Sequence, residues 1–188
     1  AETIQLLGDL LQLHPLALED VVHVHQRAKL EEFVNHLYIV TRMYSPGPEL
    51  QLEQVSMFLG PGWLLTFQDI PGDCFGNVRK RLRLNRGNIR KLGADYLCYS
   101  LIDAIIDEYF PLLESFRERL DEIEDALEDT WKPRTIRDLH DIRRELLTLR
   151  RVLWPHRDMI SSLLRGQHAL IVSQTLLYFR DCYDHLVQ

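Results

Sequence analysis

Apolar side chains recur every three or four positions along a central stretch of the chain, the spacing of one buried stripe on an α-helix. The pattern predicts a helix over residues 94–130, kinked at Pro111 because proline removes one hydrogen bond of the helix. A helix of that length extends roughly 55 Å, beyond what a compact domain needs. The stripe includes Leu97, Leu101, Ile105, Tyr109, Leu112, Phe116, Leu120 and Ile123.

A second long helix is predicted to begin at Pro133 and to end before Gly166, with Pro155 as another kink. The first helix carries twelve carboxylates against two arginines, a net charge of −10, whereas the second carries eight arginines against four carboxylates, a net of +4. Paired antiparallel, they offset part of this charge, each exposed ion pair contributing about 0–1 kcal/mol. The remaining negative charge must face solvent, a basic partner or cations.

The first third of the chain changes its period from helix to strand. Two short helices, at 3–13 and 16–23, are separated by His14-Pro15. Alternating patterns then predict antiparallel strands at 29–33, 37–44, 52–59 and 63–67, and a helix follows over 78–83. We therefore expect a fold of the α/β (α+β) class: a layered α-β-α domain with a largely antiparallel sheet over 1–92, a long helical hairpin over 93–166, and a C-terminal helix over 167–188.

Composition narrows the class of protein. The net charge of −6 argues against general nucleic-acid binding. The three cysteines lie far apart in the sequence, which indicates that the protein has no disulfide framework and works in a reducing compartment. No signal peptide is visible, and the longest uncharged apolar run, about residues 169–179, is shorter than the roughly 20 residues of a membrane span. Because the chain lacks an initiator methionine and stops inside a helical pattern, we expect the natural protein to continue.

No nucleophile elbow, Walker loop, metalloprotease motif or dinucleotide fingerprint occurs, so we expect no enzyme. The run 79–91 holds seven basic residues and invites a nucleic-acid interpretation. It lacks interleaved aromatic residues, however. Packing on acidic neighbours, or facing an anionic membrane surface, explains this run better than a nucleic acid does.

Three groups of residues offer metal ligands. Glu19 and Asp20 are adjacent and are followed by His23-x-His25, although from the sequence alone solvated side chains explain this first group better than a metal site does. Asp103, with Asp107 one turn later, borders the buried stripe and therefore needs a cation, a shifted pKa or an arginine partner. The third group, Asp181, Asp184 and His185, shares one helix face.

Taken together, these segments resemble the cytosolic domain of the CorA family of magnesium and cobalt channels. Ala28 replaces the proline expected after His25-Gln26-Arg27, a small departure from the family pattern. The family's two membrane helices with their Gly-Met-Asn motif, and its sheet strands before residue 3, are not in this sequence. The matching strings run in the family's order: HPLALED, HQR-x-K, EQVSMFL, LLTFQD, GDCFGNVRKR, GADYLCYSLIDAIIDEYFPLLE, LWPHRDMISSLLR and YFRDCYDH.

The resemblance implies a homopentamer in the cell membrane, with this fragment on the cytoplasmic side and no nucleic-acid partner. It implies that Asp20 of one subunit and Asp181 of the next form a metal site, and that Glu19 and Asp103 belong to a second site nearby. The ligand would be Mg²⁺, with Co²⁺ or another divalent cation possible. Bound metal would hold the channel closed. A zinc transporter of the same superfamily is the alternative, since it would share the fold.

Overall fold

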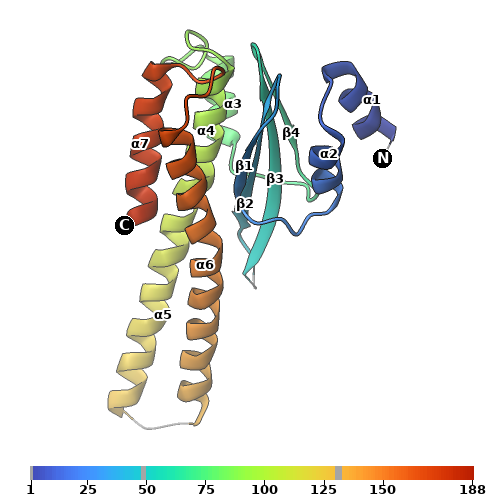
Figure 1. Ribbon diagram of the computed structural model, residues 1–188. Helices are drawn as coiled ribbons and strands as arrows, with labels where there is room; N and C mark the ends of the chain where they lie inside the picture. Colours follow the sequence, from blue (N-terminus) through green and yellow to red (C-terminus); the bar gives the residue numbers. More distant parts are fainter. Residues whose placement is uncertain (1, 48–49, 130–132) are drawn as a thin grey trace.

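The computed structural model describes residues 2–47, 50–129 and 133–188 (Figure 1). Two short helices come first, α1 (Glu2–Leu11) and α2 (Pro15–Val22). Four strands follow, β1 (Lys29–Glu32), β2 (Leu37–Ser45), β3 (Gln51–Gly60) and β4 (Trp63–Phe67). The helices that follow the strands are α3 (Gly76–Arg83), α4 (Ala94–Asp107), α5 (Tyr109–Asp129), α6 (Pro133–Arg165) and α7 (Ser173–Val187).

The strands form one antiparallel sheet in the order β1-β2-β3-β4. Each strand pairs with the next along the chain, as expected when short turns connect antiparallel strands. Gly62 in the β3–β4 turn has φ of 78°, a left-handed conformation that side chains with a Cβ rarely adopt. All four predicted strands are confirmed, and each observed end lies within one residue of the predicted end.

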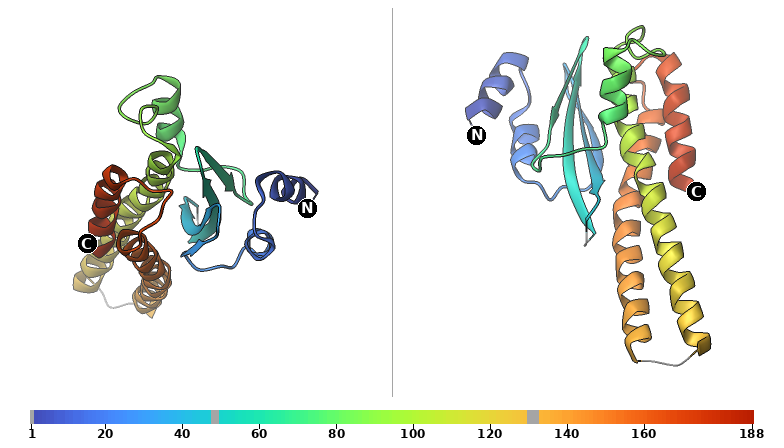
Figure 2. Two further views of the ribbon diagram at one scale, coloured as in Figure 1. Left: turned by 45° about the horizontal axis from the view of Figure 1, so that its top comes forward. Right: turned by 180° about the vertical axis from the view of Figure 1, so that it is seen from behind.

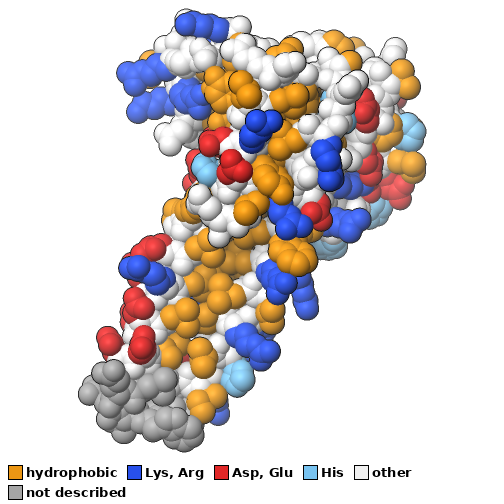
Figure 3. Space-filling view, turned by 60° about the vertical axis from the view of Figure 1, so that its left-hand side comes forward, with side chains coloured by type: hydrophobic (Ala, Val, Ile, Leu, Met, Phe, Trp, Pro, Cys, Tyr) orange, Lys and Arg blue, Asp and Glu red, His pale blue; other side chains and the backbone are white. Residues whose placement is uncertain are grey.

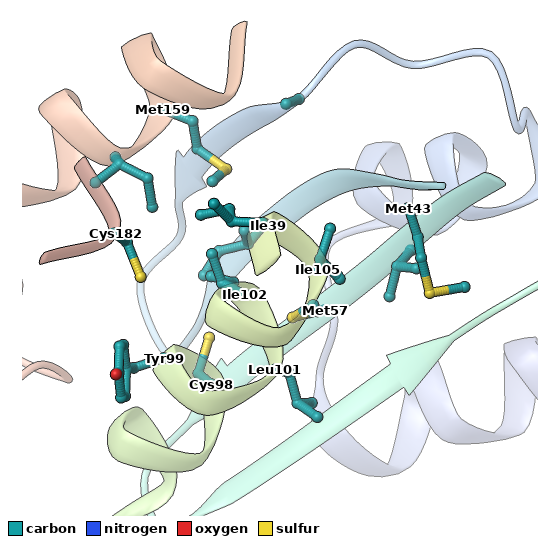
Figure 4. Packing of buried hydrophobic residues seen from close by; sticks show 14 of the residues in the cluster. Ile39, Met43, Met57, Cys98, Tyr99, Leu101, Ile102, Ile105, Met159 and Cys182 are labelled. Atoms are coloured by element: carbon teal, nitrogen blue, oxygen red, sulfur yellow. The ribbon is translucent and has the colours of Figure 1, made fainter. Parts of the chain in front are cut away.

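Helices cover both faces of the sheet, so the predicted α-β-α layering is confirmed (Figures 1 and 2). Side chains alternate between the faces of a strand. Ile39 and Met57 accordingly belong to the larger apolar cluster beneath α4, whose residues Ile102 and Ile105 are wholly buried (Figure 4). Tyr38 and Phe58 belong to a smaller cluster under α1 and α2.

The predicted kink of the long central helix is a break between two helices. α4 ends at Asp107, whose carbonyl lies four residues before Pro111, and α5 begins at Tyr109. Proline lacks the N–H that would bond this carbonyl, and its ring crowds the same carbonyl, so the helix stops there. α6, in contrast, runs unbroken from Pro133 to Arg165 with Pro155 inside it.

Helices α5 and α6 lie side by side as an antiparallel pair that extends beyond the sheet, as the sequence predicted (Figures 1 and 2). Arg119 on α5 donates hydrogen bonds to both carboxylate oxygens of Glu145 on α6, at 2.8 and 3.1 Å. An apolar stripe runs along one face of the pair between an acidic and a basic edge (Figure 3). Leu120 on α5 and Leu139 on α6 line a shallow apolar groove between the two helices.

Residue 130, the end of the predicted central helix, lies outside the described residues. Among the described helices, none has both the length and the apolar character that a membrane span requires. One apolar cluster contains residues from all three predicted units, namely 1–92, 93–166 and 167–188. The division into those units therefore stays a prediction.

Candidate metal-binding sites

One group of potential metal ligands comes together within a single chain, where α7 packs against α4. Asp103 and Asp107 stand one helical turn apart on α4, and His185 reaches them from α7. Each offers one ligand atom, and these three atoms lie within 4.8 Å of one another. The His185 Nδ1 atom is 3.7 Å from the Asp107 carboxylate, and it is buried without a hydrogen-bond partner in the described residues.

Asp103 is the most enclosed carboxylate of this group. It accepts hydrogen bonds from the Tyr99 hydroxyl at 3.3 Å and from the Cys182 thiol at 3.5 Å. Burial raises the pKa of Asp103, and the nearby charge of Asp107 raises it further; the bonds from Cys182 and Tyr99 only partly oppose this. In the described part of the chain no arginine pairs with Asp103, although the sequence made an arginine partner one possibility. Tyr99 and Cys182 are its side-chain partners instead.

Asp181 lies one turn before His185 on α7. Its carboxylate is 64% exposed and stands 4.0 Å from the His185 Nε2 atom. No lysine or arginine among the described residues forms an ion pair with it. Asp181 therefore presents an accessible carboxylate on the outer side of α7, at the edge of the group formed by Asp103, Asp107 and His185.

Asp20 lies in a different environment near the end of α2. Its Oδ2 atom accepts a hydrogen bond from Lys29 Nζ at 2.5 Å, and both side chains are 22% exposed. Burial disfavours the charge of Lys29, but its hydrogen bonds to Asp20 and Glu31 outweigh this effect and raise its pKa. Asp20 is thus partly neutralised by a lysine of its own chain.

Glu19, the residue before Asp20, points away from the core. Its side chain is 62% exposed, and the nearest basic group is the His23 ring, 4.0 Å from Oε1 and itself 67% exposed. The His23-x-His25 pair assembles no group of three ligands in the described residues.

The four predicted ligands are divided between two sides of the molecule. Glu19 and Asp20 belong to α2, which covers one face of the sheet, whereas Asp103 and Asp181 belong to α4 and α7 on the other face (Figures 1 and 2). A single chain therefore cannot bring Asp20 and Asp181, or Glu19 and Asp103, to one ion. Asp107 and His185 complete the group around Asp103; the sequence offered them as candidate ligands in two separate groups, but the ligand set implied by the family resemblance did not include them. Both follow a predicted ligand by four residues, and this spacing was their signal in the sequence.

The two sets of candidate ligands differ in their donor atoms. Glu19, Asp20 and Asp181 offer carboxylate oxygens, which suit Mg²⁺ because it keeps several waters and binds through one or two carboxylates. The group of Asp103, Asp107 and His185 adds an imidazole nitrogen, a ligand that suits Co²⁺, Ni²⁺ or Zn²⁺ better than Mg²⁺.

Comparison with known proteins identifies relatives over the whole chain. A family model described as CorA-like Mg²⁺ transporter protein matches residues 1–188. The chain is 44% identical over 190 residues to the cobalt/magnesium transport protein CorA of Thermotoga maritima, covering 100% of this chain and 54% of that protein. It is 34% identical over 185 residues to the putative metal ion transporter YfjQ of Bacillus subtilis, covering 97% and 57%. The chain thus spans about half the length of these relatives.

Two solved structures share the fold. The soluble domain of CorA from Methanocaldococcus jannaschii superposes with a TM-score of 0.84 at 18% identity, over 100% of this chain and 75% of that one. The ZntB cytoplasmic domain from Vibrio parahaemolyticus gives a TM-score of 0.78 at 14% identity, over 97% and 73%. At such identities these matches show the fold alone, whereas the family model and the Thermotoga relative show the family. The chain belongs to the CorA-like Mg²⁺ transporter family.

Proposed function

We propose that this chain is the cytosolic regulatory part of a membrane transporter for Mg²⁺, and also for Co²⁺, and that it senses intracellular Mg²⁺. The metal would bind between neighbouring copies, with Asp20 of one copy facing Asp181 of the next. Glu19 and Asp103 would contribute to a second site close by. The copies would form a closed ring, a homopentamer, on the cytoplasmic side of the cell membrane.

The observation that carries the proposal is the separation of these acids onto opposite sides of one chain. Asp20 lies on the α2 side of the sheet and Asp181 on the α7 side (Figure 2). A contact between two different faces is heterologous, and it forms a closed ring when the rotation from copy to copy completes a full turn. In such a ring every contact would bring one Asp20 to one Asp181, so every interface would hold the same site.

The surroundings of both carboxylates support this role. Asp181 is largely exposed and has no arginine or lysine partner among the described residues. Asp20 engages Lys29 through Oδ2, and no hydrogen bond to its Oδ1 occurs in the described part of the chain. Two carboxylates about 5 Å apart would repel each other by about 3 kcal/mol at an effective dielectric constant near 20. A divalent cation between them removes this repulsion and holds the copies together.

Regulation follows from this balance. At high Mg²⁺ the occupied sites would stabilise the symmetric ring and the closed pore, since the metal binds that arrangement preferentially. When Mg²⁺ falls, the sites empty and the copies separate. α7 would then move and open the pore. A site built from few carboxylates suits this task because it releases its ion readily.

A zinc transporter is the second candidate function, because the ZntB cytoplasmic domain shares the fold. Asp20 and Asp181 supply only oxygen, which favours Mg²⁺ over Zn²⁺ at the site between copies. Metal-dependent uptake by the full-length protein separates the two functions: Zn²⁺ uptake without Mg²⁺ uptake would favour the alternative.

The experiment is limited proteolysis of the full-length assembly in membranes during a Mg²⁺ titration. We expect Mg²⁺ to protect the wild-type assembly. Asp20→Ala combined with Asp181→Ala should shift protection to much higher Mg²⁺. Asp9→Ala combined with Asp121→Ala removes the same number of exposed carboxylates elsewhere and serves as the matched control. Unchanged protection in the Asp20/Asp181 variant would contradict the site.

A further inference from the structure

A cleft of about 630 Å³ lies between α6 and the segment that enters β1. Apolar side chains, among them Ala28, Leu147 and Met159, line the cleft together with Arg27, Arg150 and Arg151. This volume falls within the usual range of small-molecule sites, about 300–1,000 Å³. The cleft lies apart from the group formed by Asp103, Asp107 and His185.

The charges around the cleft are unbalanced. Arg27, Arg150 and Arg151 form no ion pair within the described part of the chain, although the protein as a whole is acidic. Asp158, the single carboxylate that lines the cleft, instead contacts Arg157 at 3.1 Å. Guanidinium groups present several fixed N–H donors that match phosphate oxygens. The cleft is therefore suited to an anion with several phosphate groups.

An aromatic side chain stands beside these arginines. Trp154 lines the cleft and is 51% exposed, a large fraction for a tryptophan within a helix. The guanidinium carbon of Arg150 lies 4.6 Å from the centre of its ring, and that of Arg157 lies 5.4 Å away. Indole rings and guanidinium planes both stack on nucleobases. Trp154 thus offers a stacking surface within reach of the phosphate-binding groups.

From this combination we infer that the cleft between β1 and α6 binds a nucleoside triphosphate. The base stacks on Trp154. The phosphates engage Arg27, Arg150 and Arg151, so the guanidinium of Arg150 moves from the indole ring to the phosphates. The apolar side chains of Leu147 and Met159 accept the less polar side of the nucleoside. A simple phosphate would leave the aromatic surface unused, and an uncharged aromatic compound would leave the arginines unused.

The test is isothermal titration of the 188-residue chain with ATP, with chelator present so that the metal sites contribute nothing. Inorganic triphosphate and adenosine are titrated separately. We expect saturable binding of ATP in the micromolar to millimolar range and at least tenfold weaker binding of the two fragments. Anionic phospholipid vesicles form a further arm, since a lipid headgroup also carries phosphate; we expect no competition from them.

Variants locate the site. Arg150→Gln combined with Arg151→Gln should weaken ATP binding at least tenfold, and Trp154→Leu at least fivefold. The matched control is Arg143→Gln combined with Arg144→Gln, an adjacent pair on α6 outside the cleft. Circular dichroism verifies that each variant folds. If ATP does not bind, if Trp154→Leu has no effect, if the control pair weakens binding equally, or if vesicles displace ATP, the inference is overturned. These outcomes leave the carboxylate site untouched, so the two proposals fail separately.

Discussion

The buried imidazole of His156 predicts how the stability of this chain depends on pH. β1 pairs with β2 only as far as Val40, so Arg42 lies beyond the end of β1. The Arg42 backbone N–H donates to His156 Nε2 at 3.0 Å, and Nδ1 lies 2.8 Å from the Val152 carbonyl, to which it donates. This geometry requires a neutral ring with its proton on Nδ1, because the other nitrogen must accept.

The magnitude follows from the pKa of His156. Complete burial lowers it from 6.5 to about 4; the Val152 carbonyl opposes this shift, and the charge of Arg42 adds to it. The unfolded chain therefore binds a proton at a higher pH than the folded chain does. Stability is full above about pH 6.5 and is lost as the pH falls towards 4. The loss is about 2 kcal/mol at pH 5 and about 3 kcal/mol when the proton is fully bound.

The assay is urea unfolding of the wild type and of His156→Gln at several pH values between about 7.5 and 4.5. The glutamine oxygen can accept the Arg42 N–H but does not titrate. Subtracting the two stability curves cancels the other histidines and carboxylates. We expect the wild type to lose about 2 kcal/mol relative to the variant between pH 7.5 and 5. Parallel curves would refute the assignment of a neutral, buried His156.

Three further perturbations probe the core and the sites. Ile102→Ala should lower the free energy of unfolding by about 2–5 kcal/mol because Ile102 is wholly buried between α4 and the sheet. The measurement is urea unfolding, and Leu113→Ala, at an exposed position, is the control that should cost far less. Equal losses in the two variants would contradict the packing. Lys29→Gln removes the ammonium group that competes with Mg²⁺ for the Asp20 carboxylate. The Mg²⁺ concentration that gives half-maximal protection of the assembly from protease should therefore fall about fivefold, and a rise would contradict this role. His185→Asn removes the imidazole nitrogen, which suits Co²⁺ better than Mg²⁺. In calorimetry the variant should therefore bind Co²⁺ about tenfold more weakly and lose much less of its Mg²⁺ binding. Equal effects on the two ions would argue against a bond from His185 to the metal.

The order and extent of the elements could be predicted because local chemistry fixes them. Period-two alternation and the turn around Gly60-Pro61-Gly62 define the β3–β4 hairpin. Pro111 predicts where the central helix is interrupted but not that it breaks, since Pro155 leaves α6 continuous. The charge difference between the two long helices did not predict their ion pair, because Arg119 belongs to the acidic helix α5 and Glu145 to the basic helix α6.

The partners of the site residues could not be predicted, because they depend on how distant segments pack. Asp103 contacts Cys182, which is 79 residues away, only because α7 lies on α4. His185 reaches Asp107 for the same reason. The Lys29–Asp20 pair needs the start of β1 to pass the end of α2, which a periodicity along the chain does not reveal. The resemblance to the CorA family singled out Asp20 and Asp181, whose spacing alone carried little information.

The most direct test of shared sites is to mix two defective copies. Full-length chains carrying Asp20→Ala and chains carrying Asp181→Ala are co-expressed, and Mg²⁺-dependent protease protection of the joint assembly is compared with that of each variant alone. In a random mixture about a quarter of the interfaces unite an intact Asp20 with an intact Asp181. We expect the mixture to regain part of the protection that each variant has lost, because these interfaces keep both carboxylates. A mixture no better protected than the separate variants would contradict a metal site formed between copies.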